Sequence, residues 1–174
     1  MTETCRGNLE RTSMEPIISV RNLKKIFTIG DNKVPALNGL DFDIYQGEFI
    51  AIVGTSGSGK STCLNMLAGL EKPSEGIIHI VGEEIEKMNE SELVTFRRNH
   101  VGFIFQSYNL IPFLDAVENV AMPLMFRGVG KEERNKAAFQ YLELMNIAKE
   151  ANHTPNQMSG GQQQRVGIAR ALVI

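Results

Sequence analysis

The feature that most constrains the fold of this chain is a glycine-rich stretch at residues 54–61, GTSGSGKS, which fits the pattern G-x-x-x-x-G-K-[ST]. The five apolar residues before it, 49–53, predict a buried parallel strand, and the residues after it, as far as Leu70, predict a helix. Because glycines let the backbone curl and aim successive N–H groups inward, we expect this loop to cradle phosphate groups.

Several side chains in and after the loop suit a nucleoside triphosphate. Lys60 would reach the β- and γ-phosphates, Ser61 would ligate Mg²⁺, and Thr62 could offer a hydroxyl to the α-phosphate. The helix that begins here adds the positive end of its dipole beneath the phosphates. The predicted contact set is Gly54, Thr55, Ser56, Gly57, Ser58, Gly59, Lys60, Ser61 and Thr62.

Composition narrows the class of protein. The chain has 174 residues, of which 43% are hydrophobic and 22% charged, as in a soluble globular domain with room for one subdomain. A formal net charge of −2 gives no basic surface for nucleic acid or anionic lipid. No apolar run is long enough to span a membrane and no signal peptide opens the sequence, so a membrane role would need a partner. Cys5 and Cys63 are too few for a zinc cluster or a disulfide framework, which favours a reducing cytoplasmic setting.

The rest of the first half predicts mainly strands. Residues 1–15 are polar and without pattern, so we expect a disordered leader, with Met14 as an alternative start. Residues 17–27 and 40–45 predict two strands of a small antiparallel sheet beside the main one, and residues 76–81 predict another strand. Asn89 with Glu92 predicts a cap that opens a short helix. The run VGFIF at 101–105 predicts a further buried strand.

Two residues near these elements have more than one interpretation. Phe27 precedes a polar turn, where it could stack on an adenine ring or fill the core. Gln106 ends the apolar run at 101–105, where open α/β sheets place ligands, so its amide could touch Mg²⁺ or an attacking water. From the sequence around Gln106 alone, the simpler interpretation is a loop glutamine that binds no ligand.

A second motif lies in the helical part of the sequence. After helical patterns that include an Asp115–Glu118 cap and a helix over residues 131–148, the motif Ser159, Gly160, Gly161 and Gln162 precedes an amphipathic helix. Ser159 and Gln162 predict a capping box, and the two glycines leave bare N–H groups that would form a second anion site. Two such sites in one chain make sense if the second serves the nucleotide of another copy.

Three ordered motifs together resemble the ATP-binding subunit of an ABC transporter. They are GTSGSGKST at 54–62, Gln106, and MSGGQQQRVGIARAL at 158–172, and the resemblance covers residues 17–174, with detail most similar to the lipoprotein-releasing or macrolide-export type. It implies an α/β fold: a P-loop NTPase core with an N-terminal antiparallel β subdomain and an inserted α-helical subdomain. The implied ATP-binding domain, 16–174, comprises the β subdomain and P-loop core (16–106), the helical subdomain (107–158) and the signature motif with its helix (159–174).

The resemblance also implies a function. The subunit would bind and hydrolyse ATP with Mg²⁺, and closure of a homodimer would drive export, or lipid or lipoprotein extrusion, by a membrane permease. Phe27 would stack on adenine, and Lys60 and Gln106 would be catalytic. Ser61 and Gln106 would contact Mg²⁺, and Gln106 would also relay the nucleotide state to the permease. Ser159, Gly160, Gly161 and Gln162 would close over the γ-phosphate of ATP held by the other copy. The subunit would be cytoplasmic, peripheral on the inner face of the membrane through the permease, and would bind no nucleic acid.

One departure from the family pattern concerns catalysis. The Walker B aspartate and the glutamate that polarises water would follow residue 174, so we expect a truncated copy of a longer ATPase, with the C-terminal part of the core sheet missing and the chain alone inactive. The alternative is a non-hydrolysing ATP-binding fragment or remnant. An ATPase of the chromosome or DNA-repair type would carry a long coiled coil between Gln106 and Ser159, where this chain has a short interval.

Overall fold

The computed structural model describes residues 15–174, and the chain divides into two compact units, Met1–Leu93 and Val94–Ile174. The expected leader at 1–15 therefore lies outside the described residues except for Glu15, as do Cys5 and the alternative start at Met14. Each unit buries apolar side chains of its own. Within residues 15–174, no helix combines the length and the apolar character that crossing a membrane requires.

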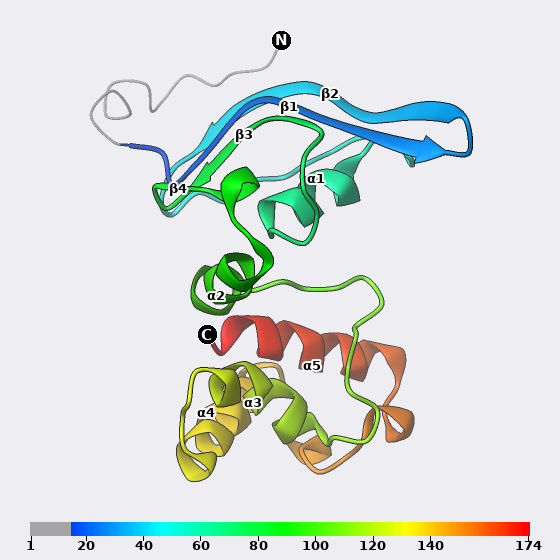
Figure 1. Cartoon of the computed structure of the whole chain (residues 1–174). Helices are drawn as coiled ribbons and strands as arrows, with labels where there is room; N and C mark the ends of the chain where they lie inside the picture. Colours follow the sequence, from blue (N-terminus) through cyan, green and yellow to red (C-terminus); the bar gives the residue numbers. More distant parts are fainter. Residues whose placement is uncertain (1–14) are drawn as a thin grey trace, which may run out of the picture. The chain divides into compact units, whose positions relative to one another are not determined.

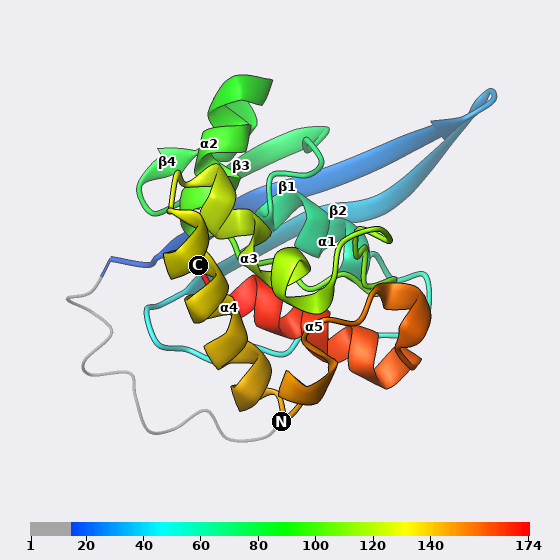
Figure 2. The ribbon, with the colours of Figure 1, turned by 90° about the horizontal axis from the view of Figure 1, so that it is seen from below.

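The first unit is built on one antiparallel sheet with the strand order β2-β1-β3-β4 (Figure 1). Its strands are β1 (Ile18–Ile29), β2 (Asn32–Ile44), β3 (Glu75–Ile80) and β4 (Glu83–Glu84). Figure 2 shows β1 and β2 side by side as a long hairpin, and their register shifts at bulges in the middle of β1. This sheet confirms the predicted antiparallel subdomain. β2 starts earlier than predicted and includes Pro35, which is tolerated because β2 is an edge strand.

Two helices and a short 3-10 turn accompany this sheet. α1 (Lys60–Leu67) lies against β2, and its C-cap is Ala68, so it ends before Leu70. The turn η2 (Ile85–Lys87) leads to α2 (Glu90–His100), which runs across the boundary between the units. The predicted cap of α2 is confirmed, because Asn89 Oδ1 accepts from Glu92 N at 3.1 Å and Glu92 Oε2 accepts from Asn89 N at 2.7 Å.

In the second unit, α3 (Ala116–Phe126), α4 (Lys131–Leu144) and α5 (Gly160–Leu172) pack together, and the 3-10 turns η3 (Ala148–Glu150) and η4 (Pro155–Gln157) lie between α4 and α5. The Asp115–Glu118 capping box at α3 is confirmed. α4 is shorter than the predicted 131–148 because Asn146 adopts a left-handed conformation and ends it. Apolar side chains of these helices and of the segments that connect or follow them form one buried core: Ala116, Val120, Ala121, Ala138, Leu142, Ile147, Ala151, Met158, Val166, Ala169 and Val173.

The two strands predicted at 49–53 and 101–105 are wrong. Neither segment is a strand, and in the first of them Phe49 is 98% and Val53 87% exposed. A buried parallel strand needs hydrogen-bonded neighbours and covered faces. Among residues 15–174 the strands are those of the antiparallel sheet, and neither segment pairs with them. Both segments are therefore chain without regular secondary structure that leads into a loop.

Candidate functional site

The loop at residues 54–61 turns sharply and leads directly into α1. Gly57 and Gly59 have φ of 79° and 86°, a left-handed conformation that favours glycine, and Gly59 is the N-cap of α1. Ser58 N donates to Thr55 O at 3.3 Å, which closes a turn inside the loop. The glycines of the motif thus allow the curl that the sequence predicts.

Close packing excludes a side chain at one of the loop positions, Gly59. A Cβ on Gly59 would collide with Ala36 O and lie 2.7 Å from Leu37 Cδ2, so β2 supports the loop at this point. A Cβ on Gly54 would lie 2.6 Å from Ser58 Oγ. Gly59 is therefore required by its backbone neighbour in the free chain, whereas at Gly54 the Ser58 hydroxyl would only have to rotate.

Lys60 lies across the loop. Its Nζ donates to Gly54 O at 2.9 Å and to Thr55 O at 2.6 Å, and it is 3.4 Å from Ser58 Oγ. The carbonyl groups at the start of the loop therefore hold the ammonium where the predicted phosphate contacts gather.

The start of α1 supplies backbone donors beside this ammonium. Cys63 N donates to Gly59 O at 2.9 Å, whereas the N–H groups of Lys60, Ser61 and Thr62 have no acceptor in the described part of the chain. Free N–H groups at a helix N-terminus, next to a cation, bind anions. The residues present therefore fit a phosphate chain, and the exposed Ser61 hydroxyl fits a ligand of Mg²⁺.

Cys63, in the first turn of α1, is a buried free cysteine. Its side chain is 2% exposed, and burial raises the pKa of the thiol above its usual value. A thiol that stays protonated packs as a small apolar group.

Phe27 lies in β1 of the same unit, in register with Val34 of β2. It is half-buried, and the Lys25 ammonium lies 5.2 Å from the centre of its ring. The ring is thus neither part of a closed core nor fully exposed. Stacking on adenine stays a prediction.

The second motif forms the start of α5 in the second unit. Ser159 Oγ accepts from Gln162 N at 3.3 Å and Gln162 Oε1 accepts from Ser159 N at 2.8 Å, so the predicted capping box is confirmed. Gln162 Nε2 also donates to Glu150 Oε1 at 3.0 Å, which fixes the side chain. Gly160 and Gly161 are exposed, as an anion site at this helix end would require.

Gln106 also belongs to the second unit and is exposed. The predicted site residues are thus divided, with Phe27 and 54–62 in the first unit and Gln106 and 159–162 in the second. In the described part of the chain no group of three His, Cys, Asp or Glu side chains could hold a metal ion. A Mg²⁺ contact from Ser61 and Gln106 therefore stays a prediction.

Sequence reasoning missed Arg170, a residue in the last turn of α5 that is only 8% exposed. Burial lowers the pKa of its guanidinium. The signal was present in the sequence, because Arg170 follows Val166 by four residues and precedes Val173 by three, which puts a charge in an apolar stripe. Such a residue needs buried hydrogen-bond acceptors.

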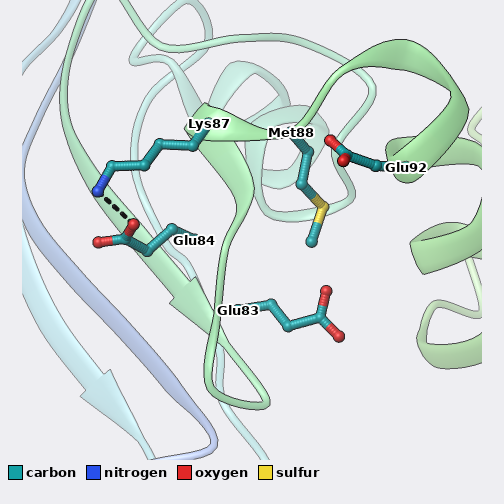
Figure 3. A pocket seen from close by; sticks show the side chains of 5 residues that line it. All are labelled: Glu83, Glu84, Lys87, Met88 and Glu92. Carbon is teal, nitrogen blue, oxygen red and sulfur yellow. Dashed lines mark ion pairs between the residues drawn. The ribbon is translucent and has the colours of Figure 1, made fainter.

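A hollow of about 410 Å³ in the first unit is acidic (Figure 3). It is lined by Glu83, Glu84, Lys87, Met88 and Glu92. Lys87 pairs with Glu84, and this hydrogen bond holds the pKa of the Glu84 carboxyl below its usual range. Three carboxylates and one cation repel phosphate, so this hollow is not a second nucleotide site.

Comparison with known proteins gives consistent results. Residues 37–174 match the family described as ABC transporter. The chain is 46% identical over 159 residues to an uncharacterized ABC transporter ATP-binding protein of Thermotoga maritima, covering 91% of this chain and 68% of that protein. It is equally identical over 159 residues to the macrolide export ATP-binding/permease protein MacB of Hahella chejuensis, of which it covers 24%. The chain thus spans about two thirds of the first relative and about a quarter of the second.

The fold matches solved structures as well. A dimeric ATP-binding cassette of Methanocaldococcus jannaschii in a post-hydrolysis state, bound to ADP and Pi, is similar with a TM-score of 0.87 and 44% identity. The similarity covers 90% of this chain and 69% of that chain. A second dimeric structure of that cassette gives the same TM-score at 45% identity.

Proposed function

The chain belongs to the ABC transporter family, and we propose that it is the ATP-binding and ATP-hydrolysing subunit of a transporter, coupling ATP-driven dimer closure to export, or to lipid or lipoprotein extrusion, by a membrane permease. The observation that carries the proposal is the loop at 54–61, where Lys60 Nζ lies across the loop beside N–H groups at the start of α1 that have no acceptor within residues 15–174. Such a set of donors suits a chain of phosphates.

Side chains of the loop, the start of α1 and two positions elsewhere have roles in this proposal. Lys60 neutralises charge on the β- and γ-phosphates, Thr62 bonds the α-phosphate, and Phe27 stacks on adenine. Ser61 and Gln106 hold Mg²⁺, which when bound neutralises charge on the phosphate oxygens.

We assign the start of α5 to the nucleotide of a second copy. Its exposed glycines and capped N-terminus offer donors in a unit that does not contain the loop. The related M. jannaschii cassette is dimeric in its ADP-bound structure. The proposed dimer therefore places residues 159–162 of each copy over the γ-phosphate held by residues 54–62 of the other.

Cysteine crosslinking tests the dimer. In a Cys5→Ser background, chains with Ser58→Cys are mixed with chains carrying Ser159→Cys, and ATP is added without Mg²⁺. We expect an ATP-dependent disulfide between the two chains, and none when Lys136→Cys, an exposed residue of α4, replaces the second cysteine. Equal crosslinking by both pairs, or none with ATP, contradicts the proposed dimer.

Hydrolysis by this chain on its own is a separate question. Neither residues 54–62 nor residues 159–162 contain a carboxylate that could activate water. The alternative to a hydrolysing subunit is therefore a non-hydrolysing ATP-binding fragment or remnant, which would bind ATP without turnover. Phosphate release from Mg-ATP decides between hydrolysis by the chain and binding without turnover. Release that the Lys60→Ala substitution abolishes would establish catalysis by the chain itself.

We place the subunit in the cytoplasm, on the inner face of the membrane, bound to a permease and to no nucleic acid. Support comes from the relative named as an ATP-binding/permease protein, in which both parts share one chain. Crosslinking in cells followed by purification of the tagged chain tests this placement. We expect the captured partner to contain membrane-spanning helices, and capture of nucleic acid instead contradicts the placement.

A further inference from the structure

Arg170 joins the last turn of α5 to a turn that is 61 residues away in the sequence. Its Nη1 donates to Asn109 O at 2.6 Å and its Nη2 donates to Tyr108 O at 2.7 Å. The guanidinium also lies 5.9 Å from the centre of the Phe105 ring. A buried charge is tolerated because both bonds go to carbonyl oxygens, and one planar group spans two neighbouring acceptors.

The turn that Arg170 holds is strained. Tyr108 and Asn109 have φ of 60° and 48°, in the left-handed region that residues other than glycine rarely adopt. Within the turn, Asn109 N donates to Ser107 O at 2.6 Å and Tyr108 N donates to Phe105 O at 3.2 Å. Two consecutive left-handed residues persist only where surrounding contacts fix them, and the guanidinium supplies two such contacts.

The segment before this turn also fits closely along α5. A Cβ on Gly102 would collide with Ala171 O, which places the start of the segment at the last turn of the helix. Toward the other end, a Cβ on Gly160 would lie 3.2 Å from the Tyr108 hydroxyl. The backbone of the segment that carries Gln106 therefore lies beside the later part of α5, from Ala171 to Gly167, and the Tyr108 side chain reaches toward the start of the helix.

We propose that Arg170 is a positioning residue, which fixes the turn after Gln106 on α5 and so holds Gln106 in a constant relation to Ser159 and the start of the helix. This inference rests on the proposed function, which assigns Gln106 and residues 159–162 to the nucleotide. Arg170 itself is not one of the residues that we assign to the nucleotide or to Mg²⁺. It acts through the carbonyl oxygens of Tyr108 and Asn109.

Amide hydrogen exchange of the nucleotide-free chain tests the inference. In Arg170→Met, we expect the amides at 106–110 to exchange about tenfold faster, while those of α3 and α4 are unchanged. Arg170→Lys should give a smaller local change, because an ammonium does not span both carbonyls. Arg165→Met, an exposed arginine of the same helix, is the control and should change neither region.

A rescue variant separates positioning from simple support of the core. Glycine adopts a positive φ with little strain, so Asn109→Gly in the Arg170→Met background should bring exchange at 106–110 back toward the wild-type rate. Uniform acceleration through α3 and α4, or unchanged exchange at 106–110, overturns the inference. If Arg170→Met does not fold, the same exchange measurements on Arg170→Lys, with and without Asn109→Gly, test the inference by the same criteria. Because no nucleotide is present, failure of the proposed function leaves this result interpretable.

Discussion

Gly57 and Gly59 show how single residues set the shape of the loop. Both have a positive φ, but the space around them differs. A Cβ on Gly57 would meet nothing within 4 Å, whereas a Cβ on Gly59 would collide with Ala36 O. Backbone conformation and packing can therefore be separated by comparing the two positions.

Gly59→Ala is expected to destabilise the chain more than Gly57→Ala. The strained φ costs about 1–2 kcal/mol at either position, and the collision at Gly59 adds about 1–3 kcal/mol. Urea unfolding followed by circular dichroism measures both variants. Equal losses of stability would show that β2 does not support the loop.

Cys63 is expected to resist thiol reagents in the folded chain. Its side chain is 2% exposed and its pKa is raised, so at pH 8 it carries less thiolate than an ordinary cysteine. In a Cys5→Ser background, Ellman's reagent should react slowly with the native chain and fully after denaturation. Fast reaction of the native chain would contradict the buried position.

At the scale of elements, the start of α5 depends on its reciprocal cap. Ser159→Ala removes the acceptor for Gln162 N and should cost about 1 kcal/mol of stability. Ser159→Asn keeps an acceptor and should retain most of it. Thermal unfolding compares the two, and an Ala variant as stable as the Asn variant would show that the cap contributes nothing.

The β1–β2 hairpin is expected to weaken in acid. Arg21 Nη2 lies 2.7 Å from Asp43 Oδ2, and this hydrogen bond holds the pKa of the Asp43 carboxyl below its usual range. Because the carboxyl has a lower pKa in the folded chain than in the unfolded chain, its ionised form stabilises the fold fully above the unfolded pKa of about 4. This stabilisation is lost as the pH falls through the lower pKa of the folded chain. Unfolding free energy measured against pH should therefore drop below about pH 4 in the wild type.

The matched variants isolate this ion pair. Asp43→Asn should flatten the acid drop, because the titrating group is gone. Asp31→Asn removes an exposed carboxylate from the turn of the same hairpin and should leave the drop in place. If the unfolding free energy of Asp43→Asn still falls in acid as in the wild type, the loss of stability does not come from the Arg21–Asp43 ion pair.

Local features of these elements were predictable, and non-local ones were not. The caps at Asn89, Asp115 and Ser159 each depend on a side chain three residues further on, so the sequence contains the whole interaction. The strands expected at 49–53 and 101–105 depend on neighbouring strands, which residues 15–174 do not provide. The contacts of Arg170 depend on the fold in the same way.

At the scale of the whole molecule, the two units differ in what they contribute. The first has the antiparallel sheet, the loop at 54–61 and α1, and the second has the helical core with the start of α5. All the loop residues that we assign to the phosphates belong to the first unit. Nucleotide binding by the loop can therefore be measured on this chain, whatever the second unit binds.

Isothermal titration of the purified chain with Mg-ATP tests the central claim most directly. We predict saturable binding of one ATP per chain, weakened about tenfold or more by Lys60→Ala, because a charge-assisted hydrogen bond is worth about 1.5–3 kcal/mol. Lys149→Ala, at an exposed position of the second unit, should bind like the wild type. A folded Lys60→Ala variant with wild-type affinity, or no binding by the wild-type chain, would contradict the assignment of residues 54–61 as the phosphate-binding loop.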